Sequence, residues 1–592
     1  MDARSCSARE PSAPNPWQAP PAFLWHALID QLLQHEPPRV ALLCIAPLRQ
    51  VSADWRAAVG AMLPVLAPRP HVPIDELAAA ASHLPGLQLL CIEGPGTTRV
   101  QRADITAEQA TALSVFGAAC PGLRSLHLLK WQHLEEAALE PLSTLTALHT
   151  LEIVSQNLHV GAAGLAALAR LPRLRCLALR CRRLDCAGLA ALPGLTSLDL
   201  SPGTLDVEAA LLPSLAELTG LRHLGLDGLG GAALAGLGCL TTLPQLSSLA
   251  LQHADLSSPE GSEAQPLQAL LELVQALGGG SDGQPRRGLR QLRLASSRSD
   301  PDAAASLLPL AALRGLESLG VAYPGLQVAP RDELAGLSGL TELALDVLLL
   351  EEQHEAEDVA AFVAAACRRL TGLRRLHLLG AQRLEEVVLE QLAGLTGLTS
   401  LSLDQAYDFG GRALAALAPL ASLRRLSLSG ISLNRASLLG VLSEAEEEEE
   451  EHPQNLLPGL TYLALRNCRL LSGPEVAQLV LALPSLRRFL HRSWPALQSA
   501  QLRCILEQKA GLQLLQTTWR PAAAPDLPAA PAEPSQRQRE QRQRHEEDAA
   551  LCRAFRLRLQ HSLPSESGLP SVAPLFAWDP EQALTGVLHV QA

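Results

Sequence analysis

Three cysteines recur at a spacing of five residues in the first half of the chain: Cys176, Cys181 and Cys186. Thiolates are common ligands of structural zinc, so such a run has the residue type that a metal site needs. No two cysteines of the chain have the CxxC spacing that is typical of zinc sites, however. Most of the other cysteines lie among leucines, as Cys239 and Cys367 do. The pattern therefore predicts reduced thiols, as in a protein of the cytosol or nucleus, and no metal.

A second feature that could do chemistry is the glycine cluster GGGSDGQPRRG at residues 278–288. It lacks the GxxxxGK[ST] pattern with which backbone amides and a lysine hold phosphates, so it is interpreted as a linker. Neither GxSxG nor HExxH is present, and no paired carboxylates are placed on loops. Histidines and cysteines are spread along the chain without converging. The sequence therefore predicts no enzymatic activity, no catalytic residues and no cofactor.

The elements that position all these residues come from one recurring segment, LxxLxL, which is found about fourteen times. Several successive copies start 25 or 26 residues apart. A degenerate copy, LQLLCI, precedes the others at Leu87, and the last, LRRFLH, is irregular. The copies start at Leu123, Leu148, Leu174, Leu195, Leu221, Leu246, Leu289, Leu316, Leu340, Leu373, Leu398, Leu423, Leu460 and Leu486.

The spacing of the leucines predicts a short parallel strand in each copy. Leucines at positions one, four and six should point inward, and the residues at positions three and five should point outward, because side chains alternate across a strand. A second apolar run follows each strand, as at 164–174 and 413–423, and its spacing fits a short helix or 3₁₀ segment. One copy cannot bury its leucines alone, so neighbouring copies must stack.

A period of roughly 20–29 residues with this leucine pattern resembles the leucine-rich repeat family. The resemblance covers most of the chain and implies an α/β fold: a leucine-rich repeat solenoid, or horseshoe, with a small helical N-terminal domain. The chain departs from the family three residues after each LxxLxL, where Asn, Cys or Thr is usual. Only Cys468 fits there, while Trp131 is among the residues that do not. We therefore expect water or neighbouring backbone to satisfy the turns.

Composition divides the chain into four parts. Residues 1–20 are polar and Pro-rich, which predicts disorder and no secretory signal. Residues 21–66 are predicted to be helical and are followed by a Pro-rich connection to a solenoid over 87–515. Residues 520–592 are predicted to form a low-complexity spacer and a charged helical tail. No apolar run is long enough to span a membrane, and the net charge of −12 argues against general affinity for nucleic acid.

Residues 23–59 carry a further family signal. Three leucines share one face of a predicted helix, and LRQVSADWRAAV then resembles the closing helix of an F-box, with Ser52 among its matching positions. The resemblance implies that this segment binds the adaptor of a cullin–RING ubiquitin ligase through apolar anchors. The alternative is a helical cap that shields the first repeat. The residues expected at the adaptor are Leu24, Leu28, Leu32, Val51, Trp55 and Arg56.

Outward strand positions form the concave surface of such a solenoid, and most of them are small here. Large aromatic and arginine side chains dominate the energetics of protein interfaces, so the sparse examples mark where a partner would bind. Two patches are predicted, one near the start of the repeats and one toward their C-terminal end. The residues are Lys130 and Trp131 in the first, and Arg375, His377, Arg425, Tyr462 and Arg466 in the second.

These features predict a non-catalytic, protein-binding protein of the cytoplasm or nucleus. An F-box joined to leucine-rich repeats resembles the substrate receptors of cullin–RING ubiquitin ligases, which implies a ligase adaptor and a protein substrate of unknown identity as partners. The alternative is a scaffold or structural protein of the cytoskeleton or cilium, with a helical cap and no role in ubiquitylation. Neither nucleic acid nor a membrane is expected as a partner.

Overall fold

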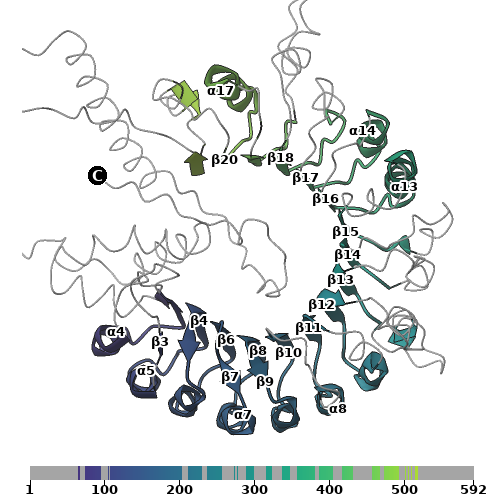
Figure 1. The fold of residues 1–592 in the computed structure, drawn as a ribbon. Helices are drawn as coiled ribbons and strands as arrows, with labels where there is room; N and C mark the ends of the chain where they lie inside the picture. Colours follow the sequence, from purple (N-terminus) through teal and green to yellow (C-terminus); the bar gives the residue numbers. More distant parts are fainter. Residues whose placement is uncertain are drawn as a thin grey trace, which may run out of the picture. The chain divides into compact units, whose positions relative to one another are not determined.

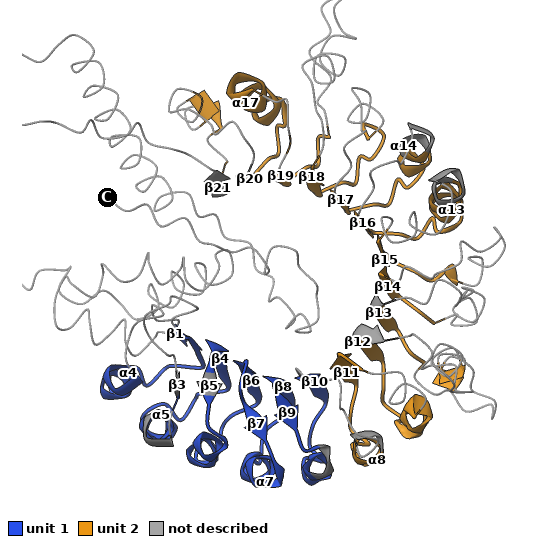
Figure 2. Ribbon diagram, in the orientation of Figure 1, with its two compact units in different colours: residues 1–204, 565–572 blue, residues 205–564, 573–592 orange. Residues whose placement is uncertain are grey.

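A computed structural model gives the fold of the repeats (Figure 1). It divides into two compact units, residues 1–204 with 565–572 and residues 205–564 with 573–592 (Figure 2). The structure describes residues 64–66, 74–94, 104–105, 107–202, 211–229, 236–255, 272–273, 276–277, 288–298, 315–322, 337–346, 356–379, 386–404, 417–430, 457–466, 468, 472–492, 501, 504–505, 508–509, 512 and 514–517.

Unit 1 is a parallel sheet with helices on one face (Figure 1). Its strands, in their order of pairing, are β1 (Val65–Leu66), β2 (Leu89–Glu93), β4 (Ser125–Trp131), β6 (Thr150–Ser155), β8 (Cys176–Cys181) and β10 (Ser197–Pro202). The segments between them include α4 (Ile74–Ala81), α5 (Ala107–Ala119), the 3₁₀ helix η2 (Glu136–Ala138), α6 (Leu139–Leu142), α7 (Ala162–Ala169) and the 3₁₀ helix η3 (Cys186–Ala191). Two short parallel pairs accompany them, β3 (Asp104–Ile105) with β5 (His133–Leu134) and β7 (His159–Val160) with β9 (Arg183–Leu184).

Unit 2 repeats the arrangement, and its strands pair in parallel in the order of the sequence. They are β11 (His223–Asp227), β12 (Ser248–Asp255), β13 (Gln291–Arg298), β14 (Ser318–Ala322), β15 (Glu342–Asp346), β16 (Arg375–Leu379), β17 (Ser400–Asp404), β18 (Arg425–Ser429), β19 (Tyr462–Arg466), β20 (Arg488–Arg492) and β21 (Leu514–Thr517). Its described helices are α8 (Leu211–Ala216), the 3₁₀ helix η4 (Leu237–Thr242), α13 (Ala356–Arg369), α14 (Glu386–Ala393) and α17 (Gly473–Ala482).

The leucines set the register of both sheets. The fourth position of each LxxLxL pairs with the fourth position of the next strand, as Leu126 does with Leu151 and Leu376 with Leu401. Both members of each pair are at most 1% exposed. In β6, β16 and β17, burial alternates as the sequence predicts, with outward residues partly exposed between buried leucines. In β8, β11 and β19, the small residue between the two leucines is buried as well. The α/β leucine-rich repeat solenoid is thus confirmed, and buried leucines supply most of its apolar core.

The irregular last copy keeps the same register with different residues. In β20, Phe489 pairs with Leu463, and His491 pairs with Leu465. Both replacements are buried, with Phe489 fully enclosed and His491 only 2% exposed. An imidazole therefore occupies an inward position that is leucine in most other copies.

The chain leaves several strands through a residue with left-handed backbone. Gly228 and Gly430 have φ of 75° and 69° at the eighth position of their repeats. Lys130, at the same position, has φ of 61°, which is unusual for a residue with a side chain. The amides of Gly228 and Gly430 donate to the carbonyls of Gln252 and Arg466 on the next strand. Neighbouring backbone thus satisfies these turns, as the sequence predicts.

Two predictions for the segment before the repeats are corrected by the structure, and others concern residues that it does not describe. Val65–Leu66 forms β1 rather than the end of a helical segment, and α4 lies within the predicted Pro-rich connection. The parallel partner of β1 is β2, so an extra strand precedes the first LxxLxL copy. Residues 1–63 and 520–592, which include the F-box-like segment, the spacer and the charged tail, lie outside the described residues. Among the described helices, none has the length and hydropathy to span a bilayer.

Candidate functional site

Each unit has one face of its strands covered by helices (Figure 1). The outward side chains of the strands lie on the opposite face. We call that opposite face the open face. On β17 its residues are Ser400 and Ser402, both partly exposed, between the buried Leu401 and Leu403. Small residues of this kind provide little contact energy, so large exposed side chains on the open face are the natural anchors for a partner.

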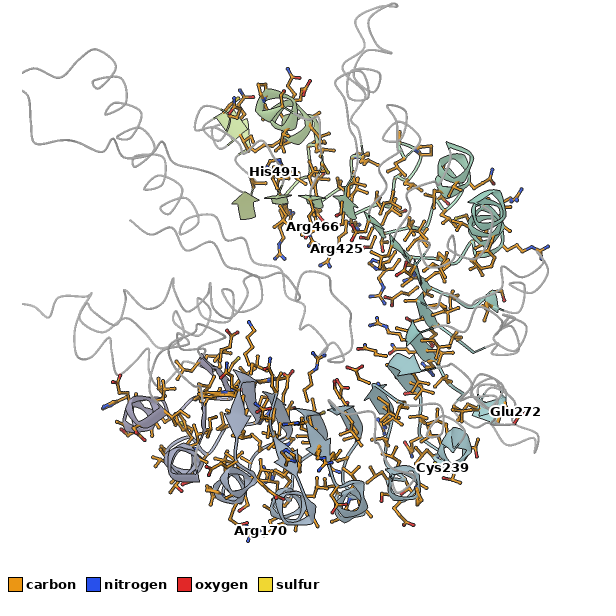
Figure 3. The ribbon with its side chains drawn as sticks, in the orientation of Figure 1. Arg170, Cys239, Glu272, Arg425, Arg466 and His491 are labelled. Carbon is orange, nitrogen blue, oxygen red and sulfur yellow. The ribbon has the colours of Figure 1, made fainter. Side chains whose placement is uncertain are left out.

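The largest such group lies on β16 to β20 of unit 2, and Figure 3 shows Arg425 and Arg466 on the strands there. Arg375, Arg425 and Arg488 occupy the same position of three alternate strands. Between them, in register, lie Ser400 on β17 and Tyr462 on β19. Because neighbouring strands are about 4.8 Å apart, the three arginines are spaced by about 10 Å.

A second arginine precedes each of these three. Arg374, Arg424 and Arg487 are exposed, and the carbonyls of the first two accept hydrogen bonds from the amides of the next repeat. We call the three pairs the arginine cluster: Arg374, Arg375, Arg424, Arg425, Arg487 and Arg488. Of these six arginines, the sequence predicted only Arg375 and Arg425 as binding residues. The signal that could have found the others is LRR, which opens three alternate copies of the repeat and no other copy.

One carboxylate organises the N-terminal end of the cluster. Glu342 on β15 is only 15% exposed and lies 2.9 Å from the Arg375 guanidinium, measured from Oε2 to Nη2. Its other oxygen is 3.9 Å from Nη2 of Arg293 on β13. Burial lowers the pKa of Arg293, while Glu342 raises it. The ion pair with Glu342 holds the half-exposed Arg375 in one orientation on the open face.

An aromatic ring holds the middle of the cluster. The guanidinium carbon of Arg425 lies 5.9 Å from the centre of the Tyr462 ring, which is within the range of a cation–π contact. Arg425 is exposed, and Tyr462 is partly exposed on the neighbouring strand. The structure thus brings together two of the residues that the sequence predicted in the C-terminal patch. His377, on β16, is in register with Ser402 and partly exposed, so it lies on the same face.

Arg466 is a correction to the predicted patch. It is only 8% exposed at the last position of β19, where its backbone carbonyl accepts from Gly430. In β19 the outward positions after Tyr462 are buried, since Ala464 is 0% exposed and Arg466 lies two residues beyond it. The Arg466 guanidinium is therefore not an accessible anchor.

Trp131 is a second correction. Its side chain is buried at 8% exposure, and its indole N–H donates to the carbonyl of Ile92 at 3.4 Å. Trp131 stands where the repeat family has a buried Asn, Cys or Thr. Cys468, at the same position of a later repeat, is also buried, and its thiol lies 3.6 Å from the Leu428 carbonyl. Both side chains reach a backbone carbonyl of the preceding repeat, so Trp131 is structural rather than an exposed anchor.

Unit 1 has a smaller polar group on its open face. The Lys130 ammonium is 68% exposed and lies 3.8 Å from the Glu93 carboxylate on β2. His127 is on β4, the strand of Lys130, and Glu152 is on the neighbouring strand β6. Nδ1 of His127 and Oε2 of Glu152 are 2.6 Å apart. These four groups combine acids with bases and have no arginine anchor, in contrast to the cluster of unit 2.

Two of the three regularly spaced cysteines have thiols whose pKa is raised by burial. Burial raises the pKa of the Cys176 thiol, and it raises the pKa of Cys181 to about 12. Both thiols are therefore protonated at neutral pH, whereas the thiolate is the reactive and metal-binding form. The Cys186 side chain lies outside the described residues. No three His, Cys, Asp or Glu side chains converge as metal ligands within the part of the chain that the structure describes.

Comparisons with known proteins find only distant similarity to solved structures. No protein-family model matches it, and no curated protein does. An internalin from Listeria monocytogenes is similar at 18% identity and a TM-score of 0.34, covering 66% of this chain and 93% of that one. A leucine-rich repeat protein of Leptospira interrogans has 14% identity and a TM-score of 0.27, covering 73% and 91%. With identities and TM-scores this low, neither similarity bears on what this chain binds.

Proposed function

We propose that the chain is a non-catalytic protein-binding protein and that a partner docks on the open face of unit 2. The observation that carries this proposal is the arginine cluster. It sets guanidinium groups in register across β16, β18 and β20, exposed on the first two strands and partly exposed on β20, with Tyr462 between two of them. Arginine and tyrosine are enriched among the residues that dominate protein interfaces. Surrounding small residues such as Ser402 and Ser427 leave room for a partner to approach the strands.

The more specific proposal concerns residues 23–59. Their resemblance to an F-box, with Trp55 and Arg56 at matching positions, supports a role as the substrate receptor of a cullin–RING ubiquitin ligase. In that role, unit 2 holds the substrate while the N-terminal segment binds the adaptor. The alternative is a scaffold or cytoskeletal or ciliary structural protein, in which the same segment is a helical cap. The substrate receptor should bind the ligase adaptor, and the scaffold should not.

The test is a pull-down of the purified adaptor by the full-length chain, by Trp55→Ala and by a control variant. Trp17→Ala is a suitable control, because Trp17 lies outside the F-box-like segment. Adaptor binding by wild type and Trp17→Ala, with loss in Trp55→Ala, would support the receptor. Absence of binding by the wild-type chain would refute the receptor and favour the scaffold, with a partner on unit 2 as the remaining role.

A further inference from the structure

The arginine cluster has a regular chemical pattern across five neighbouring strands. Arginine pairs open β16, β18 and β20, while hydroxyl-bearing pairs, Thr399-Ser400 and Thr461-Tyr462, open β17 and β19. We propose that this cluster binds an acidic segment of a partner protein, which lies across the strands so that its carboxylates meet successive arginine pairs. This inference rests on the proposed function of the open face and names the chemistry of its partner.

The charge of the cluster is largely uncompensated. Arg375 has Glu342 as a partner, but Arg374, Arg424 and Arg487 form no ion pair within the described residues. Among the described outward positions of β16 to β20, one carboxylate is present, that of Asp404 at the far end of β17. A positive face on a chain of net charge −12 is complementary to an acidic ligand, and complementary charge favours encounter and correct alignment.

The cluster is also held in place before a ligand arrives. Glu342 orients Arg375, and the ring of Tyr462 lies against Arg425. The backbone beneath is fixed as well, because Thr399 Oγ1 donates to the Arg374 carbonyl at 2.9 Å and Thr461 Oγ1 donates to the Arg424 carbonyl at 3.1 Å. Groups that are already ordered lose less conformational entropy on binding, so a short ligand can gain affinity here.

Geometry sets the length of that ligand. From Arg375 to Arg488 there are four strand spacings, or about 19 Å, on a path that crosses the sheet. An extended chain advances about 3.3 Å per residue, so roughly six residues span the cluster. Guanidinium groups bind carboxylates through paired N–H donors, which suits glutamate and aspartate side chains on such a segment.

An acidic protein segment fits better than a nucleic acid. A short ligand senses mainly charges within about one Debye length, roughly 8 Å at physiological salt, which here are the cluster and the carboxylate of Glu342 beside Arg375. A long polyanion also meets the rest of a chain whose net charge is −12. In addition, Tyr462 already contacts Arg425, so its ring is not an open platform for base stacking.

The test measures binding of a labelled peptide to the full-length chain by fluorescence anisotropy. The probe is Glu-Glu-Pro-Glu-Glu-Pro-Glu-Glu, in which proline favours an extended conformation. Its counterpart has Gln for every Glu. The variant Arg424→Glu/Arg425→Glu reverses the central pair. The matched control, Arg124→Glu/Arg222→Glu, makes the same change in net charge at exposed arginines outside the cluster.

We expect the acidic probe to bind and the Gln probe not to bind. Affinity should fall by about tenfold or more in the cluster variant, since a contact is lost and repulsion is added. It should stay within about twofold in the control, because distant exposed charges are screened. Three-residue probes should bind more weakly than the eight-residue probe, and twelve-residue probes no more tightly. If circular dichroism shows that the double variant is unfolded, Arg487→Glu serves in its place.

Three results would overturn the proposal. Equal losses in the cluster variant and the control would indicate non-specific attraction. A single-stranded RNA of eight nucleotides that binds more tightly than the peptide, in a way that depends on Arg424 and Arg425, would assign the face to nucleic acid. The third result is peptide binding that appears only after Glu444 and Glu446–Glu451 are replaced by Ser. That result would mean that the chain's own acidic run, and not a partner protein, is the ligand of the arginine cluster. None of these readouts involves the adaptor, so the outcome is independent of the Trp55→Ala test.

Discussion

His491 should make the stability of unit 2 depend on pH. It is 2% exposed at an inward position of β20, and its ring stacks near Phe489 with centroids 6.1 Å apart. Burial lowers its pKa from 6.5 to about 4. The unfolded chain therefore binds a proton near pH 6.5, while the folded chain resists protonation until about pH 4. The stability that depends on a neutral His491 is complete above pH 6.5 and is lost as pH falls toward 4.

The size of the effect follows from these two pKa values. A shift of about 2.5 pKa units corresponds to at most about 3 kcal/mol, and roughly 2 kcal/mol of this is lost between pH 7.5 and pH 5.0. His491→Leu restores the residue that most other copies have at this position and removes the titrating group. We expect the variant to be less sensitive to acid than wild type by that amount.

The assay is urea denaturation at pH 7.5 and pH 5.0, combined with hydrogen exchange of the peptide that contains β20, which reports on this part of unit 2. His159→Leu is the control, since His159 is exposed on β7 and its replacement should leave the pH dependence of β20 unchanged. Equal losses of stability on acidification in wild type and His491→Leu would refute the reasoning. They would mean that the imidazole is hydrated or already charged in the folded chain.

Three further predictions concern unit 1. Gly94→Ala should lower its stability by about 1–3 kcal/mol in urea denaturation, because the new Cβ would lie 2.6 Å from the Lys130 carbonyl oxygen; an unchanged midpoint would show that the backbone moves aside. Leu198→Asp buries a charge at a position that is 0% exposed and should abolish cooperative melting by circular dichroism, whereas Ser197→Asp at the outward neighbour should not. Glu136→Ala removes the carboxylate that accepts from two amides at the start of α7, so we expect a loss of about 1–2 kcal/mol by urea denaturation, and a loss under half of that would count against this capping role.

The fold was predictable because one short pattern is repeated many times. Each LxxLxL specifies its own strand, and the period of the copies brings equivalent leucines together, so the register of Leu126 with Leu151 follows from the sequence alone. The outward position that opens each strand was predictable for the same reason, and Arg375 and Arg425 occupy it in β16 and β18.

Other parts of the site depend on information that the strand pattern does not contain. The alternation breaks down toward the ends of β4 and β19, where Trp131 and Arg466 are buried at positions that the strand pattern alone does not identify. The bridging role of Glu342 depends on three separate strand pairings, which place β15 between β13, the strand of Arg293, and β16, the strand of Arg375. No local pattern in the sequence indicates that these three charges meet.

The pairing of β12 with β13 has a consequence for engineering. Ser248 and Gln291 are direct partners although 43 residues separate them, whereas Ser125 and Thr150 are partners across 25. Closing the longer connection costs only about 0.5 kcal/mol more in chain entropy, because that cost grows with the logarithm of length. The connection between β12 and β13 is therefore a suitable place to graft a reporter domain without interrupting the stack of strands.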